Sequence, residues 1–150
     1  MAHKGARWTA EELQRHLSKP KEPQKPARNK LPRLSESDLQ HQVIQWFAHT
    51  YAEIYRTGAL IAIPNGGKRG RGAQAQIRKE GVWRGASDLV LFVPKGIYHG
   101  AVLEMKAEGG KISSEQFEWL EHRRQSGYHA GIAWTYDEGT RFFDEYLALE

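Results

Sequence analysis

The spacing of apolar residues predicts that a folded domain begins with a helix just after Ser35. Ser35 stands where an N-cap is expected, and Asp38 follows at the third helical position. Behind this cap, apolar residues recur at the spacing that places them on one stripe of a helix, namely Leu39, Val43, Trp46 and Phe47. We therefore expect this stripe to face a hydrophobic core.

Short apolar runs further along the chain predict four strands, at residues 60–63, 86–93, 98–106 and 128–134. A short helix is predicted at 74–80. A second begins at a Ser113–Gln116 capping box and runs to about Gln125, where Gly127 ends it. A closing helix covers about 138–147. This order predicts an α/β fold in which a mixed β-sheet is flanked by helices.

The first 34 residues differ in composition from the rest of the chain. Residues 1–33 hold nine Lys or Arg against three Glu, and four of the six prolines lie between Lys19 and Leu34. Prolines at this density prevent a long helix or a central strand. We therefore predict a basic, largely mobile segment over 1–34, with a short helix from Ala10 to about Leu17, and a folded domain over 35–150.

Two acidic residues occupy matching positions on neighbouring predicted strands. A hairpin folded about Gly96 places Asp88 opposite Glu104, with their side chains about 5 Å apart. Lys106 shares a face with Glu104 because strand side chains alternate. Two carboxylates at this separation repel by about 3 kcal/mol at an effective dielectric near 20. A divalent cation between them would remove that repulsion.

The same residues suggest a chemistry. Mg²⁺ usually takes one or two carboxylates together with water and a substrate phosphate. Asp88 and Glu104 are the candidate carboxylates, and the main-chain carbonyl of Met105 is expected to point toward the same edge. Lys106 is placed to position a water molecule or to balance charge on phosphorus. The pattern points to metal-assisted hydrolysis of a phosphodiester.

Composition limits the alternatives. The chain has no cysteine, which excludes disulfides and thiolate metal sites and agrees with a reducing cytoplasm. None of the seven histidines stands at HxxxH spacing, so a zinc site or an HNH-type nuclease is disfavoured. No apolar run approaches the ~20 residues of a membrane span. A net charge of +4 and a pI of about 9.4 favour a polyanionic partner.

A glycine-rich basic stretch follows the first predicted strand. Its backbone N–H groups and cations suit it to hold a phosphate backbone, but it lacks the P-loop pattern, so no nucleotide cofactor is expected. Trp83 precedes the strand that carries Asp88, where it is placed either to stack on DNA or to join the core. The candidate DNA-binding residues are Asn65, Gly66, Gly67, Lys68, Arg69, Arg71 and Arg84.

Five short motifs occur in the order found in one nuclease family. Gly85 with Asp88, followed by Glu104-Met105-Lys106, resembles the paired motif of the PD-(D/E)xK restriction-endonuclease-like superfamily. Within it, the chain resembles the VRR-NUC family of virus-type replication-repair nucleases. A lone D…ExK pattern is common by chance, whereas five motifs in order over about residues 35–135 are specific. Ser87 stands where superfamily members often have proline. The other motifs are Glu36 with Gln40, Pro64 to Gly67, and Gln116 before Trp119.

The resemblance implies a restriction-endonuclease-like core and a role for each matched residue. Asp88 and Glu104 would hold Mg²⁺ or Mn²⁺, and Lys106 would be the catalytic lysine. Glu36 would reach the metal through a water molecule, and Gln116 would assist from the following helix. Two of these residues have structural alternatives. Glu36 is also an acid favoured by a helix N-terminus, and Gln116 also stands where a capping box needs Glu or Gln.

The resemblance further implies a structure-selective endodeoxyribonuclease. It would act as a homodimer on branched DNA, such as a four-way Holliday junction in replication and repair, in the cytoplasm of a bacterial or phage-infected cell. Two other functions stay open. One is a non-catalytic DNA-binding module on a nuclease scaffold, and the other is a hydrolase of small phosphate esters, which the basic tail and loop disfavour.

Overall fold

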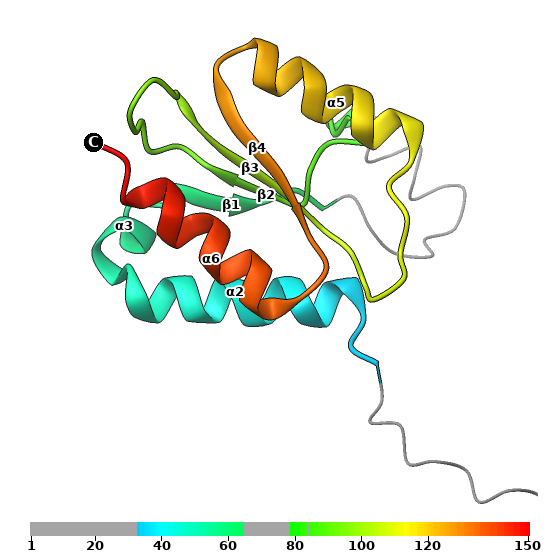
Figure 1. Ribbon diagram of the computed structural model, residues 1–150, viewed down its shortest axis with the longest axis horizontal. Helices are drawn as coiled ribbons and strands as arrows, with labels where there is room; N and C mark the ends of the chain where they lie inside the picture. The colour runs from blue at the N-terminus through cyan, green and yellow to red at the C-terminus, as the bar shows by residue number, and fades with distance from the viewer. Residues whose placement is uncertain (1–32, 65–78, 84) are drawn as a thin grey trace, which may run out of the picture. The chain divides into compact units, whose positions relative to one another are not determined.

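The computed structural model describes residues 33–64, 79–83 and 85–150 of the chain (Figure 1). The described part belongs to one compact unit that begins at Arg33. A mixed four-stranded sheet lies between helices, which confirms the predicted α/β fold. In chain order the elements are α2 (Glu36–Thr50), α3 (Ala52–Arg56), β1 (Leu60–Ala62), β2 (Leu89–Leu91), β3 (Gly100–Met105), α5 (Ser114–Gln125), β4 (Tyr128–Ala133) and α6 (Tyr136–Leu147).

The four strands follow one another across the sheet in chain order. β1 pairs with β2 and β2 with β3 in antiparallel fashion, whereas β3 pairs with β4 in parallel. β2 and β3 form the predicted hairpin, closed by two hydrogen bonds between Lys95 and Tyr98. Gly96 adopts φ +53° in this turn, a backbone conformation that favours glycine. Both strands are shorter than predicted, because β2 covers three residues and β3 six.

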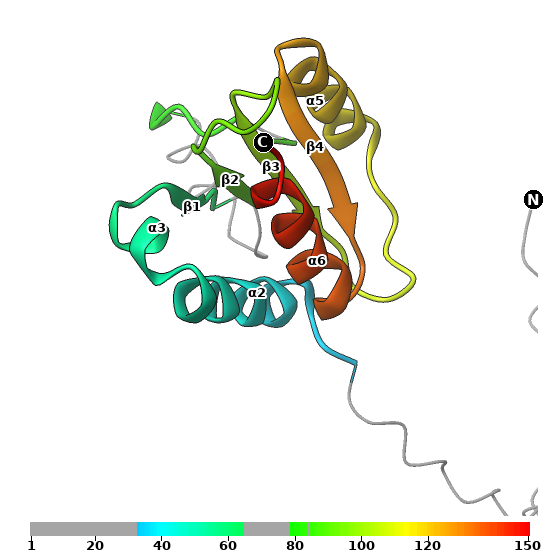
Figure 2. The same ribbon diagram turned by 60° about the vertical axis from the view of Figure 1, so that its left-hand side comes forward.

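Helices cover both faces of the sheet (Figures 1 and 2). Alternation sends Leu89, Leu103 and Met105 into a core with α2 and α6, where Leu39, Val43 and Phe47 of α2 are buried as predicted. Val90 and Val102 point to the other face and pack against Leu120 of α5. The same alternation assigns Asp88, Glu104 and Lys106 to the α5 face.

The helix termini show why some boundaries were predicted and others were not. Capping boxes at Ser35 and Ser113 begin α2 and α5, as the sequence predicts. Helix α6 begins at Tyr136, two residues before the prediction, because the Thr135 side chain accepts a hydrogen bond from the Glu138 backbone. Helix α3 was not predicted, since it has five residues and buries none of them.

Several predicted segments lie outside the described residues. These are the N-terminal helix, almost all of the basic segment 1–34, the glycine-rich loop and most of the helix at 74–80. The predicted boundary between residues 34 and 35 is therefore untested. Among the described helices, none has both the length and the apolar character needed to cross a membrane.

Candidate active site

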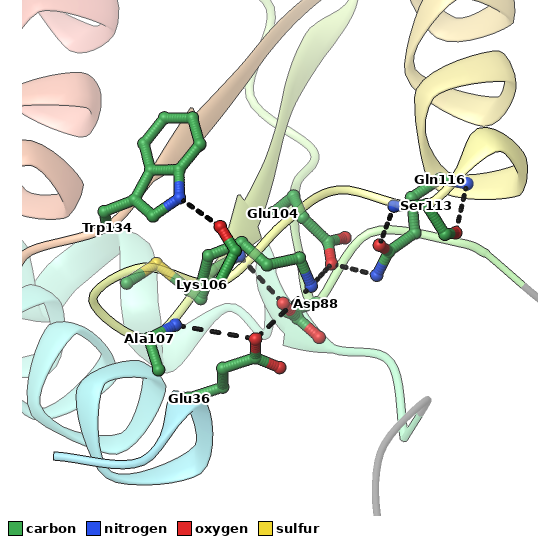
Figure 3. A network of polar contacts seen from close by, with 10 residues as sticks. Glu36, Asp88, Glu104, Lys106, Ala107, Ser113, Gln116 and Trp134 are labelled. Carbon is green, nitrogen blue, oxygen red and sulfur yellow. Dashed lines mark hydrogen bonds and ion pairs between the residues drawn. The ribbon is translucent and has the colours of Figure 1, made fainter. Parts of the chain in front are cut away.

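The hairpin register brings two carboxylates together at the end of the sheet (Figure 3). Leu89 pairs with Leu103, and the same register places Asp88 opposite Glu104, as the sequence predicts. The Asp88 carbonyl accepts a hydrogen bond from Ile63 at 2.8 Å, so the backbone of Asp88 bonds toward β1 rather than toward β3. Asp88 and Glu104 are therefore a non-hydrogen-bonded pair, the kind in which cross-strand side chains approach most closely.

Glu104 is almost fully enclosed, with 1% of its surface exposed. Its Oε1 atom accepts hydrogen bonds from Lys106 Nζ at 2.7 Å and from Gln116 Nε2. Its Oε2 atom is buried and has no hydrogen-bond partner within the described part of the chain. Burial, followed by the nearby charge of Asp88, raises the pKa of Glu104 to about 7. One oxygen of the carboxylate is thus hydrogen-bonded, and the other has no hydrogen-bond partner among the described residues.

Asp88 is partly buried and is fixed by the backbone of the opposite strand. Its Oδ2 atom accepts a hydrogen bond from the Met105 N–H at 2.8 Å. Burial raises the pKa of Asp88, although the Met105 hydrogen bond and the charge of Lys106 act in the opposite direction. Because the N–H and C=O of one strand residue point to the same side, the Met105 carbonyl is directed toward Asp88 as well.

Lys106 is a buried cation among acids, with 4% of its surface exposed. Its ammonium lies 2.7 Å from Glu104 Oε1 and 3.6 Å from Glu36 Oε1. Burial alone would lower the pKa of Lys106, but Glu104, Glu36 and Asp88 together outweigh it and raise the pKa. Lys106 is therefore protonated at neutral pH. One ammonium faces three acids, so the site is negative overall when all are ionised.

Gln116 caps α5 and also contacts Glu104. Its Oε1 atom accepts a hydrogen bond from the Ser113 backbone at 3.0 Å and completes the capping box of α5. Its Nε2 group donates to Glu104 at the same time. The cap therefore orients the amide so that its donor end faces the carboxylate.

Glu36 reaches the site from the first turn of α2. Its Oε1 atom lies 3.5 Å from the Ala107 N–H and 3.6 Å from Lys106 Nζ, with half of the side chain exposed. Glu36 therefore interacts with Lys106 as well as with the dipole of its own helix. Its predicted link to a metal through water is untested.

The sequence does not predict the hydrogen bonds that hold the turn at residues 107–110, next to Glu36 and Lys106. The Trp134 indole donates to the Gly110 carbonyl at 3.0 Å (Figure 3). The Gly110 N–H in turn donates to the Ala107 carbonyl at 2.7 Å. A Cβ on Gly110 would lie 2.9 Å from that carbonyl and 3.4 Å from Glu36 Oε1. The Gly109-Gly110 pair signals a turn, but nothing in the sequence identifies Trp134 as its partner.

The site offers few ligands for a hard divalent cation. Within the described ranges, no group of three or more His, Asp or Glu side chains is placed to hold a metal ion. The candidate donors are instead the pair Asp88 and Glu104 with the Met105 carbonyl, a small set that matches the preference of Mg²⁺ for one or two carboxylates. The unpartnered Oε2 of Glu104 is an oxygen available to such a cation.

The predicted DNA-binding residues cannot be placed relative to this site. Asn65 to Gly67, Lys68, Arg69, Arg71 and Arg84 all lie outside the described residues. Trp83 is described and is not part of the core, because 72% of its surface is exposed.

Comparisons with known proteins agree with the fold and the motifs. The family model for the VRR-NUC domain matches residues 34–134, more than half of the chain. A solved structure described as a VRR_NUC domain protein superimposes with a TM-score of 0.66 and 23% identity, over 79% of this chain and 92% of that one. At this identity the superposition establishes the fold alone. No curated protein matches the chain.

Proposed function

This chain belongs to the VRR-NUC domain family, a nuclease-type family, and from that membership we propose that it is a Mg²⁺- or Mn²⁺-dependent endonuclease acting on DNA. The observation that carries the proposal is the state of Glu104. One of its oxygens is fixed by Lys106 and Gln116, and the other is buried without a hydrogen-bond partner among the described residues. A buried polar atom left unsatisfied costs stability, so such an atom is a candidate for a functional contact.

Each side chain of the site has a separate role in the proposed hydrolysis of a phosphodiester. Asp88 and Glu104 would hold the cation, which would supply Lewis-acid activation of water and phosphate. Gln116 keeps the Glu104 carboxylate in one orientation. Lys106, protonated and buried, stabilises the charge that develops on the phosphoryl oxygens. Glu36 is half-exposed beside Lys106, and we assign to its carboxylate the role of holding a water molecule and accepting its proton.

We further propose that the substrate is branched DNA and that the enzyme acts as a homodimer. Cutting two strands of a four-way junction symmetrically requires two active sites, and the described part of one chain contains one such constellation. The basic composition of residues 1–33, with nine Lys or Arg against three Glu, would add electrostatic attraction to the phosphate backbone.

Cleavage of end-labelled four-way junction, flap and linear duplex DNA with Mg²⁺ or Mn²⁺ tests the chemistry. Lys106→Met removes the ammonium while keeping much of the side chain, and we expect cleavage to fall by about 10²-fold or more. Lys95→Met is the matched control, because Lys95 lies in the hairpin turn at the other end of β2 and β3. A Lys106→Met enzyme with wild-type activity, or wild-type cleavage in EDTA, would refute the proposed mechanism.

The same assay tests the substrate. Paired symmetric cuts confined to the junction, together with a dimeric mass by light scattering, would support the proposed homodimer. Equal cutting of all three DNAs would keep the nuclease chemistry and remove the branch selectivity. Tight binding without cleavage under any metal condition would identify a DNA-binding module instead.

A further inference from the structure

Trp83 is the most exposed aromatic side chain among the Trp, Tyr and Phe residues that the structure describes, with 72% of its surface accessible. An indole can bury about 150–250 Å² and usually does so in a core or an interface. Here most of that apolar area faces solvent. The other four tryptophans of the chain are at positions 8, 46, 119 and 134. Of the three in the described part, Trp46 and Trp119 are partly buried and Trp134 is 37% exposed.

Trp83 lies close to the candidate active site along the chain and in space. The Ala86 N–H donates to the Trp83 carbonyl at 3.2 Å, which closes a turn between the two residues. The Cα atoms across such a turn are within about 7 Å, and the two further residues to Asp88 span at most about 7 Å. The backbone of Trp83 is therefore within about 14 Å of Asp88, a distance covered by about four nucleotides along one strand of duplex DNA.

The segment that presents Trp83 is held in place by α5. Gly85 adopts φ +81°, and a Cβ at this position would lie 2.9 Å from the backbone carbon and oxygen of Glu115. The chain thus passes directly against the first turn of the helix that supplies Gln116. The backbone just after Trp83 and the Glu104 carboxylate consequently both contact the first turn of α5, which keeps the backbone of this segment near the site.

We propose that Trp83 is a stacking platform for an unpaired nucleobase beside the scissile phosphate. This inference rests on the proposed function and specifies its substrate as DNA in which a base near the cut has lost a stacking neighbour. A base inside an intact duplex is already stacked and must be unstacked before it can meet the indole, whereas a base at a branch is available. Every base has a π-face, so the contact selects DNA structure rather than sequence.

Binding without catalysis tests the stacking contact separately from the nuclease chemistry. The full chain is titrated in EDTA with a flap DNA that carries 2-aminopurine as the unpaired base at the branch, and with a duplex that carries a paired 2-aminopurine. The variants are Trp83→Ala and Trp83→Phe. Ile97→Ala is the control, since Ile97 is 86% exposed and lies in the hairpin turn away from Asp88 and Glu104. Exposed positions are chosen so that folding is retained, which circular dichroism verifies.

We expect the wild type to bind the flap more tightly than the duplex and to change the fluorescence of the unpaired base. Trp83→Ala should weaken flap binding by about 5- to 150-fold, the range for loss of one base–aromatic stack. Duplex affinity should change by less than about twofold, because phosphate contacts dominate there. Trp83→Phe should retain most of the flap affinity, and Ile97→Ala all of it.

Two results would overturn the stacking role. Equal losses of flap and duplex affinity in Trp83→Ala would mean that the indole has no selectivity for unpaired bases. Unchanged flap affinity would mean that it makes no contact. If the expected binding pattern appears but the wild type cleaves no DNA with Mg²⁺ or Mn²⁺, the stacking platform stands and the proposed nuclease activity does not.

Discussion

Replacing Glu104 with glutamine removes a buried ionisable group, so it should change how the free energy of unfolding depends on pH. Burial and then the charge of Asp88 raise the pKa of Glu104 from 4.5 to about 7 in the metal-free fold. The folded state therefore binds more protons than the unfolded state between these values, and stability falls as pH rises from about 4.5 to about 7. At 1.36 kcal/mol per pKa unit, the decline is about 3 kcal/mol.

Urea denaturation in EDTA at several values between about pH 4.5 and pH 8 measures this effect. Glutamine keeps the size of Glu104 and an oxygen that can accept the hydrogen bonds from Lys106 and Gln116. Other titrating groups are common to both proteins and largely cancel. We expect the stability of the wild type minus that of Glu104→Gln to fall by about 3 kcal/mol across this range. A difference that does not vary with pH would show that the fold does not raise the pKa of Glu104.

Magnesium extends the same experiment to the proposed metal site. A cation bound to Glu104 competes with its proton and stabilises the ionised carboxylate. Saturating Mg²⁺ should therefore remove the decline at neutral pH in the wild type and have a smaller effect on Glu104→Gln. Equal effects of Mg²⁺ on both proteins would contradict the role of Glu104 as a ligand.

Three further substitutions test separate contacts in the fold and the candidate site. Gln116→Glu keeps the acceptor that caps α5 but places a second carboxylate against Glu104, so nuclease activity should fall by about tenfold or more and the loss of stability should be larger at about pH 8 than at about pH 5; a loss that does not vary with pH would contradict the contact with Glu104. Burial lowers the pKa of His129 in the folded state. The wild type should therefore lose stability relative to His129→Phe as pH falls below about 6.5, which denaturation of both proteins at about pH 5 and pH 7.5 measures. Gly139→Val should destabilise the fold by about 1–3 kcal/mol, because its Cβ would lie 2.8 Å from Val43 Cγ2, and an unchanged urea midpoint would refute the close packing of α2 and α6.

The parts of the fold that were predictable are those specified by local sequence. The capping boxes at Ser35 and Ser113 and the turn at Gly96 each lie within a few consecutive residues, and each is found where expected. The turn fixes the hairpin register, and the register brings Asp88 opposite Glu104. A short-range signal therefore placed the central pair of the candidate site.

What could not be predicted depends on contacts between residues distant in the chain. Glu36 meets Ala107 only because α2 packs beneath the sheet, and Trp134 meets Gly110 only because β4 pairs with β3. The choice between the two roles of Gln116 was also undecidable from spacing, since one amide caps with its oxygen and donates with its nitrogen. These arrangements follow from tertiary packing, which leaves no periodic signal in the sequence.

The most direct test of the proposed nuclease is single-turnover cleavage of an end-labelled four-way junction by the wild type and Asp88→Asn. Each protein is assayed with Mg²⁺ and with EDTA, after circular dichroism has verified that the variant is folded. The expected result is cleavage by the wild type with Mg²⁺ but not with EDTA, and a rate at least about 10²-fold lower for Asp88→Asn, because the substitution removes half of the carboxylate pair. Cleavage by Asp88→Asn at the wild-type rate would contradict it.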